Sequence, residues 1–339
     1  MVFRKTLQSS RSICLLLMIA ILAGMLFGFN PLLSLEQKAY DRMATLRHRA
    51  AGIPVTIVAI DDKSLKRIGD WPWPRSYIAD IINTLSKNGA RIQGISILYR
   101  SRELNNGLAE LKNFRERIHQ NPPIGKKQTL NKIDHLLTET QTRLNHDDRL
   151  ISAVRRARNA VLPLRFSLAE SGGQIPNDLS DWLKLNAIKV GEPSAGQNQP
   201  TQAADFLSGR HLDKPITASQ VQQPYAELSG KSGALGHTNL IVDQDMITRS
   251  IPLLIRFQNR EFLSIALQIA IKYFGASIQD IRPVSTALHL KHIHIPTVGH
   301  HRMLIDFNAR ETNIEKFSAV DVLEEKIPEK SFQRKIVLL

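Results

Sequence analysis

A strand, a polar loop and a helix follow one another between residues 55 and 88, and this block constrains the fold more than any other stretch. The apolar run 55–60 predicts a buried strand. The polar loop after it carries Asp61-Asp62-Lys63-Ser64 and then Gly69-Asp70-Trp71-Pro72-Trp73-Pro74-Arg75. Apolar residues then recur at helical spacing up to Leu85, and proline suits a first helical turn. Open α/β sheets bind ligands at the carboxyl ends of their strands. The block therefore predicts an α/β fold with polar side chains at such an edge.

Composition narrows the class of protein. The chain has 339 residues, a formal net charge of +14 and 42% hydrophobic residues, enough for a sizeable core in one large or two ordinary domains. Its positive charges are spread out and no zinc-finger spacing occurs, so an anionic lipid surface is favoured over nucleic acid as partner. Motifs for nucleotide binding, zinc proteases, serine hydrolases and kinases are absent, so we expect neither an enzyme nor a cofactor.

The N-terminus predicts a membrane anchor. A basic tail, residues 1–12, precedes an uncharged stretch of 17 residues, 13–29, at the short end of a membrane span. No clear small-residue cleavage site ends this stretch, so we favour an uncleaved anchor over 13–33 rather than a signal peptide. The basic flank places the tail in the cytoplasm and residues 34–339 in the periplasm. The only cysteine, Cys14, excludes an intrachain disulfide, and a membrane-buried thiol is favoured over intermolecular pairing.

A charged insert, residues 103–145, follows a second predicted strand over 91–98. Apolar residues in both halves of the insert recur at steps of three and four, with Arg115 interrupting the first row, which predicts two antiparallel helices joined through one seam. The seam residues are Leu104, Leu108, Leu111 and Ile118, then Leu130, Ile133, Leu137, Thr140 and Leu144. A dimer contact or signalling lever is one interpretation. A hairpin lying on its own domain is preferred, because short helix pairs commonly pack locally.

The remaining elements complete the predicted architecture. They are a helix opened by Asp147-Asp148, a strand over 160–166, a helix over 261–273 and a closing strand over 335–339, separated by a long polar loop over 171–215 that Trp182-Leu183 pins. The expected fold is α/β: a mixed central sheet with flanking helices, an inserted helical hairpin and one N-terminal transmembrane helix.

A second motif lies between residues 233 and 252. Its polar members are His237, Asn239, Asp243, Asp245 and Arg249. We expect the two acids to cap a tight turn between two strands. Asp243-x-Asp245 resembles the opening of a calcium loop, but the rest of that loop is missing, so calcium is not predicted.

Histidines cluster near the C-terminus. Strands over 289–295 and 300–307, joined at Gly299, would place His292 and His294 on one face with His301 nearby. Zinc needs three or four convergent ligands and no carboxylate or thiolate joins these histidines, so a metal site is not predicted. A pH response through several histidines titrating near 6.5 is the simpler hypothesis.

Together these motifs resemble the type-two CHASE domain, a cyclase/histidine-kinase-associated sensory extracellular domain. That family places Ile-Asp-Asp-x-Ser and Gly-x-Trp-Pro-Trp-Pro-Arg after a transmembrane helix, and later Gly-His-x-Asn and Asp-x-Asp-Gly-x-x-Arg-x-x-Pro. This chain carries them at residues 60–64, 69–75, 236–239 and 243–252. It departs at Ser96, where the family has an acid, and at Met246, where the family has glycine.

The resemblance implies a periplasmic sensory domain in the N-terminal part of a longer, homodimeric inner-membrane receptor. A serine/threonine kinase, histidine kinase or nucleotide cyclase beyond residue 339 would be its output, and a small molecule or environmental signal its input. The candidate ligand-binding residues are Asp61, Asp62, Ser64, Trp71, Trp73, Arg75 and Ser96.

Structural roles compete with ligand binding at these residues. One aspartate would cap the turn while the other pairs with Arg75, and one tryptophan would pack while the other faces a cleft. Two other functions stay open: a periplasmic scaffold that binds a partner through the hairpin, and a periplasmic enzyme using Asp61 and Asp62.

Overall fold

The computed structural model describes eleven segments of the chain: residues 13–15, 18–19, 37–43, 54–120, 127–168, 179–189, 215–243, 245–284, 286–299, 301–307 and 314–339. They belong to two units, 1–52 with 306–313 and 53–305 with 314–339. In the first unit residues 13–15, 18–19 and 37–43 are helical. The basic tail and most of the predicted anchor lie outside the described residues. Within the described segments, no helix has both the length and the apolar character that a membrane span requires.

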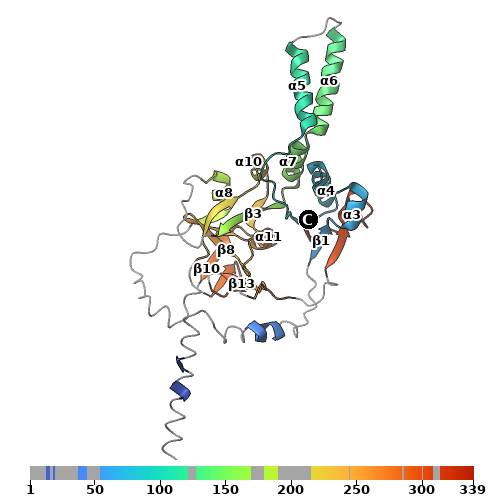
Figure 1. Cartoon of the computed structure of the whole chain (residues 1–339). Helices are drawn as coiled ribbons and strands as arrows, with labels where there is room; N and C mark the ends of the chain where they lie inside the picture. The colour runs from blue at the N-terminus through green and yellow to red at the C-terminus, as the bar shows by residue number, and fades with distance from the viewer. Residues whose placement is uncertain are drawn as a thin grey trace, which may run out of the picture. The chain divides into compact units, whose positions relative to one another are not determined.

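A seven-stranded sheet forms the centre of the second unit (Figure 1). Its order is β14 (Glu315–Ser318), β1 (Val55–Ala59), β15 (Ile336–Leu338), β2 (Ile92–Gly94), β3 (Ala160–Leu168) and β5 (Ala218–Gln222), and β6 (Ala234–His237) also pairs with β3. Only the β3–β5 pair is antiparallel. The predicted mixed sheet is therefore confirmed. Its last strand in sequence, β15, lies between β1 and β2.

Helices cover both faces of this sheet. The amide of Gln93 donates to the Ser86 hydroxyl at 2.8 Å in α4 (Arg75–Lys87), while a Cβ on Gly94 would lie 2.8 Å from Ile269 of α11 (Ile265–Tyr273). Neighbouring strand residues point to opposite faces, so α4 and α11 lie on opposite sides of β2. On the α4 side are α7 (His146–Ala157), α3 (Asp62–Ile68) and α12 (Ala319–Leu323).

Short antiparallel strands surround the far side of α11. They form three groups: β4 (Ala187–Lys189), β9 (Arg260–Leu263) and β8 (Leu254–Phe257); β10 (Ile281–Val284), β11 (Ala287–Leu290) and β12 (Ile293–Pro296); β13 (Arg302–Leu304) and β7 (Ser250–Pro252). Leu267 and Ile271 of α11 pack with Leu288 and Leu290 of β11 in a separate apolar cluster. Helix α11 is thus buried between the main sheet and this antiparallel layer.

Three predicted boundaries are wrong. The helix expected over 261–273 begins at Ile265, because residues 260–263 pair as β9 and Ser264 caps the helix by accepting from Leu267 N at 3.2 Å. The strand expected over 91–98 joins the sheet only at Ile92–Gly94. The polar stretch 171–215 contains α8 (Asp181–Leu185) and β4, although Leu183 is buried as the pinning prediction requires.

The histidine-rich hairpin also differs from its prediction. Strands β11 and β12 pair directly, and the turn between them holds Lys291 at φ 54° and His292. His292 therefore does not share a strand face with His294, whose ring instead meets the His289 ring edge-to-face, with 4.9 Å between the ring centroids. His301 precedes β13, which pairs with β7. The continuous strand predicted over 289–295 is therefore wrong, because a two-residue turn interrupts it.

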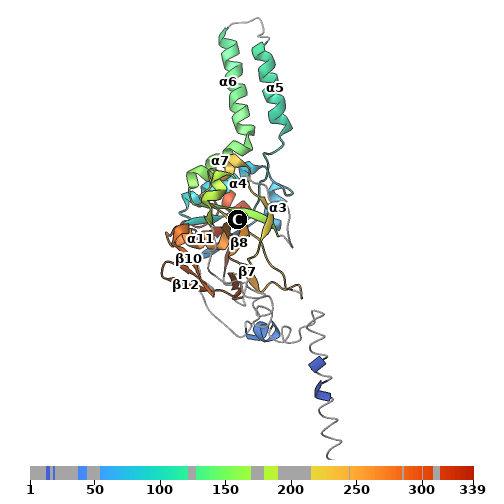
Figure 2. The ribbon, with the colours of Figure 1, turned by 90° about the vertical axis from the view of Figure 1, so that its left-hand side faces the viewer.

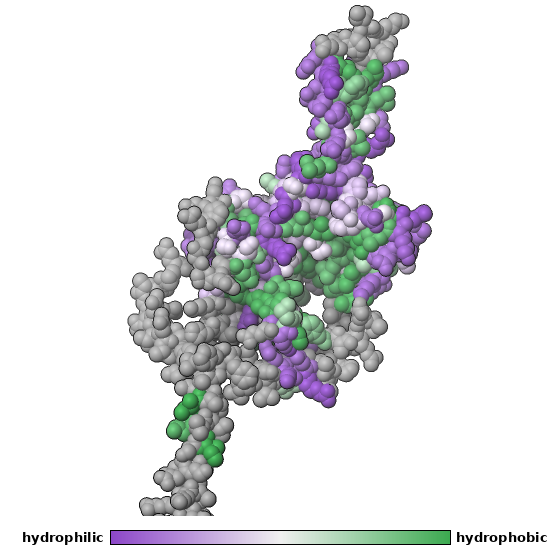
Figure 3. All heavy atoms as spheres, viewed as in Figure 1, coloured by the Kyte–Doolittle hydropathy of each residue, from purple (hydrophilic) through white to green (hydrophobic). Residues whose placement is uncertain are grey.

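The predicted hairpin consists of α5 (Asn106–Gln120) and α6 (Lys127–Leu144). The preference for a hairpin lying on its own domain is wrong: no α5 residue is buried, and both views show the pair extending away from the sheet (Figures 1 and 2). The seam is half-buried at Leu108, Leu111 and Ile118, as predicted, whereas Leu104 is 97% exposed. In Figure 3, hydrophobic side chains gather on one part of the hairpin surface and hydrophilic side chains flank them.

Arg115 belongs to this seam rather than interrupting it. Its Nε donates to Asp134 Oδ1 at 2.8 Å and its Nη1 to Gln141 Oε1 at 3.2 Å. Both partners are on α6, so the charged position ties the two helices together. The hydrogen bonds from Arg115 hold the pKa of Asp134 below its usual value, although partial desolvation opposes this.

Candidate functional site

Asp61 caps helix α3 and joins three segments at the carboxyl edge of the sheet. Its Oδ1 accepts from Ser64 N at 3.0 Å, from Ser64 Oγ at 2.7 Å and from Ser318 Oγ at 2.7 Å. Ser64 Oγ also accepts from Val320 N at 3.1 Å, so the start of α12 is held by the same group. The prediction that one aspartate caps the turn is confirmed.

The two serines favour the charged form of Asp61. Burial alone would raise the pKa of this carboxyl, but the hydrogen bonds from Ser318 and Ser64 outweigh it, and the pKa lies below the ordinary value. The two hydroxyls are also 2.8 Å apart, and each has a single proton to donate. Asp61, Ser64 and Ser318 therefore form a triad whose contacts link α3 to the segment that enters α12. Lys63 beside it donates to Asp321 at 2.6 Å, a further link to α12.

One of the two tryptophans packs as predicted, whereas a cleft at the other stays a prediction. Trp73 is buried and its Nε1 donates to Gly69 O at 2.7 Å, which closes the loop between α3 and α4. Trp71 is 39% exposed and meets Trp73 edge-to-face, with 5.8 Å between ring centroids. One ring therefore packs and the other faces solvent.

Arg75 is the centre of a buried polar cluster that we call the arginine hub: Arg75, Tyr99, Asp147 and Tyr225. Its guanidinium pairs with Asp147, and the two side chains are only 11% and 7% exposed. The rings of Tyr99 and Tyr225 lie 4.9 and 5.4 Å from the guanidinium carbon, within cation–π range. The predicted pairing of Arg75 with the other aspartate is wrong, because Asp62 is exposed on α3 while Asp147 is the buried partner.

The arginine hub holds the base of the hairpin. Arg75 also donates to the main-chain carbonyl of Ser101, and Asp147 Oδ2 accepts from Glu103 N at 2.9 Å. These contacts join the segment entering α5 to the start of α7, which follows α6. Tyr225 Oη donates to Asp147 at 3.2 Å, and burial followed by the Asp147 charge raises the pKa of Tyr225.

The predicted ligand residues thus fall into separate places. Asp61 and Ser64 form a triad with Ser318, and Arg75 belongs to the hub. Ser96 donates through Oγ to the carbonyl of Leu339 at 2.8 Å, so it ties β2 to β15. Sequence reasoning missed Ser318, Tyr99 and Tyr225, which no local pattern marks. Asp147 was recognised only as a helix-opening residue. Ligand binding by the seven candidates stays a prediction.

The second motif is built around another buried arginine. Arg249 Nη1 donates to Asp243 Oδ2 and Asp245 Oδ1, both at 2.9 Å, and Nη2 donates to Asp245 Oδ2 at 2.6 Å. Met246 takes φ 64° in the turn, where its N donates to Asp243 O at 2.9 Å. The turn therefore adopts the conformation that glycine prefers without having glycine. The arginine hydrogen bonds lower the pKa of Asp245, and both acids accept hydrogen bonds from Arg249.

His237 and Asn239 secure the end of β6. Asn239 accepts from Phe166 N at 2.8 Å and donates to Phe166 O at 2.7 Å, so its side chain acts as a strand partner for β3. His237 is buried, and neither ring nitrogen has a hydrogen-bond partner among the described residues. Burial lowers the pKa of His237 to about 3, only partly offset by the nearby main chain of Leu253. His237 is therefore neutral at physiological pH.

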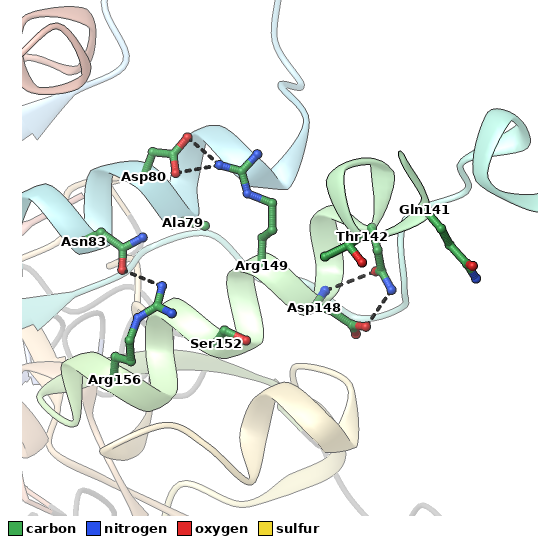
Figure 4. Close-up of a pocket in the computed structure, with 10 residues that line it drawn as sticks. Ala79, Asp80, Asn83, Gln141, Thr142, Asp148, Arg149, Ser152 and Arg156 are labelled. Atoms are coloured by element: carbon green, nitrogen blue, oxygen red, sulfur yellow. Dashed lines mark hydrogen bonds and ion pairs between the residues drawn. The ribbon is translucent and has the colours of Figure 1, made fainter. Parts of the chain in front are cut away.

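A polar hollow of about 460 Å³ lies between α4, α7 and the end of α6 (Figure 4). Two arginines cross it: Arg149 donates to both oxygens of Asp80, at 2.8 and 3.0 Å, and Arg156 donates to Asn83 at 3.1 Å. These contacts clamp α7 to α4. Over the segments that the structure describes, no three His, Cys, Asp or Glu residues converge as metal ligands.

The structure is an α/β domain with an inserted hairpin. Many of its motif residues form hydrogen bonds or ion pairs with one another or with residues at the base of the hairpin. The model of the CHASE2 domain family matches residues 14–339, and the chain belongs to this family. CHASE2 domains are extracellular sensory domains of signalling receptors and are not catalytic. Comparison with curated proteins and with solved structures found no match.

Proposed function

We propose that this chain is the periplasmic sensory part of an inner-membrane receptor, anchored by residues 13–33, that regulates a cytoplasmic serine/threonine kinase, histidine kinase or nucleotide cyclase. The position of β15 carries the proposal. Val55 and Thr56 of β1 pair with Ile336 and Val337, and β15 pairs with β2 on its other side. A receptor's anchor and its output would therefore attach to adjacent strands at the centre of one sheet.

The arginine hub offers a route from the hairpin to this sheet. Helix α4 begins at Arg75, and Glu103 and Asp147 connect that residue to both ends of the hairpin. A signal acts by stabilising one arrangement over another. Displacement of the hairpin would strain the hub contacts and shift α4 against the sheet, toward β1 and β15.

The proposed periplasmic location of the domain and cytoplasmic location of the basic tail are tested with single cysteines. In a Cys14→Ser background, Leu104→Cys places a thiol at a 97% exposed position and Ser9→Cys places one in the basic tail. A membrane-impermeant maleimide, applied to cells with a permeabilised outer membrane, should label Leu104→Cys at once and Ser9→Cys only after lysis. The reverse pattern would refute the topology.

A second candidate function is partner binding through the hairpin, with a second copy of the chain as the partner. The favouring observation is that Phe114 and Leu136 are 52% and 61% exposed outside the seam. Asn105 Nδ2 donates to Leu144 O at 3.0 Å, so the hairpin's ends meet and residues 106–144 can be replaced by a short Gly-Ser linker. The scaffold hypothesis predicts that this deletion leaves the α/β unit folded and abolishes dimerisation. An unchanged dimer would exclude it.

A further inference from the structure

A cleft of about 540 Å³ lies at the amino-terminal end of β6, bounded by α8, α11 and the short helix η2 (Ile278–Asp280). It shares no lining residue with the arginine hub or with the hollow between α4 and α7. The residues that carry the inference are Trp182, Leu185, Gln268, Ile271, Lys272 and Ile278.

Gln268 is the first indication of a ligand. It is only 1% exposed, lines the cleft from α11, and its Nε2 has no hydrogen-bond partner among the described residues. Buried side-chain amides in folded proteins are nearly always hydrogen-bonded, because an unpaired polar group inside the protein is destabilising. We therefore regard this amide as a candidate hydrogen-bond donor to a ligand that enters the cleft.

Trp182 supplies a second donor in the same lining. Its indole Nε1 is buried and has no acceptor within the described parts of the chain. An indole can only donate, whereas a glutamine amide can turn to present either of its ends. Two unpartnered donors in one lining fit a group with two acceptor oxygens.

The charge of the lining favours an anion. Lys184 and Lys272 line the cleft, and none of the lining residues that the structure describes carries a carboxylate. Lys184 Nζ lies 3.0 Å from Asp181 Oδ1, and the Asp181 side chain is 95% exposed. Such a surface ion pair contributes little to stability. Asp280 accepts from Ser277 N at 2.8 Å and lies outside the lining.

The walls of the cleft favour an apolar body. Ile271 is buried, Ile278 is half-buried, and Leu185 at the edge is 68% exposed. Ligand sites typically combine apolar walls with a few convergent polar groups, which is the composition found here.

We propose that this cleft binds a small organic acid, a carboxylate carried on a compact apolar body. The carboxylate accepts from Trp182 Nε1 and Gln268 Nε2 near the Lys272 ammonium, and the apolar body lies against Ile271, Ile278 and Leu185. The inference stands on the geometry of the cleft and does not depend on the receptor assignment.

Phenylacetate and its neutral amide, phenylacetamide, are matched probes for this site. Calorimetric titration into the full chain in lipid nanodiscs, with empty nanodiscs as the blank, should show saturable one-site binding of phenylacetate. Its affinity should exceed that of phenylacetamide at least tenfold. Lys272→Gln should remove most of this preference, whereas Lys87→Gln, which changes an exposed lysine paired with Glu325, should leave it intact.

Gln268→Met separates ligand binding from a structural role. It removes the unpartnered amide while keeping the length of the side chain, so Tm of the ligand-free protein should rise and phenylacetate affinity should fall at least tenfold. Trp182→Phe should also weaken binding. The proposal is overturned if neither probe binds, if the amide binds as tightly as the acid, or if Gln268→Met and Lys272→Gln both bind phenylacetate normally.

Discussion

Acidification should destabilise this domain through one buried histidine. His237 has an unfolded-state pKa near 6.5 and a folded-state pKa of about 3. Between these values the unfolded chain binds a proton that the folded chain does not, so stability falls as pH decreases. The contribution is complete above pH 6.5. Each unit of pKa difference corresponds to about 1.4 kcal/mol, so lowering the pH from 7 to 5 should cost roughly 2 kcal/mol through this residue alone.

The measurement is urea unfolding of the full chain in detergent at pH 7 and pH 5. His237→Leu lacks the titrating ring, so its stability should fall by about 2 kcal/mol less than that of the wild type over this interval. Other groups with shifted pKa values, including Asp61 and His301, are shared by both proteins and cancel in the difference. His292→Gln, in an exposed turn, is the matched control and should behave like the wild type. Equal losses in the wild type and His237→Leu would refute the reasoning.

Three further predictions concern local geometry, each measured by urea unfolding of the full chain. Arg75→Met and Asp147→Leu should each cost about 3 kcal/mol, because each leaves a buried charge without its partner. The double variant should cost at least about 2 kcal/mol less than their sum, and strict additivity would show that the hub is not coupled. Met246→Gly should stabilise by about 0.5–1 kcal/mol, since Met246 is 82% exposed at positive φ; a loss would mean that the side chain matters. Gly236→Ala should cost about 3 kcal/mol, because its Cβ would lie 2.5 Å from the Cα of Ile265, and unchanged stability would contradict this close approach of β6 to α11.

Local patterns predicted the elements that depend on neighbours in sequence. Helix α4 was expected over 75–88 and spans Arg75–Lys87, and Leu108, Leu111 and Ile118 lie in the hairpin seam as their spacing predicted, whereas Leu104 does not. Strand β3 also begins at the expected residue, Ala160. The helices carry one apolar face at the helical period, and β3 is a short continuous apolar run, so a short window of sequence contains the whole signal.

Contacts between distant segments were not predictable in this way. Arg75 and Asp147 are 72 residues apart, and the 39 residues of the hairpin separate Asn105 from Asn145. The hub arises because the fold brings the start of α4 against the start of α7. The cleft beside Gln268 likewise combines α8, β6 and α11, and its signal is a missing hydrogen bond, which no sequence displays. The prediction for the histidine hairpin was wrong because a local pattern misled: Lys291 and His292 fit a strand pattern but form a turn.

The central claim, regulation of a cytoplasmic output by this sensory domain, is tested most directly by sequencing the gene in frame beyond the codon for Leu339. The account predicts apolar membrane spans followed by the motifs of a serine/threonine kinase, a histidine kinase or a nucleotide cyclase. A stop codon directly after Leu339, or a downstream region without any such output, would contradict it and favour the hairpin scaffold.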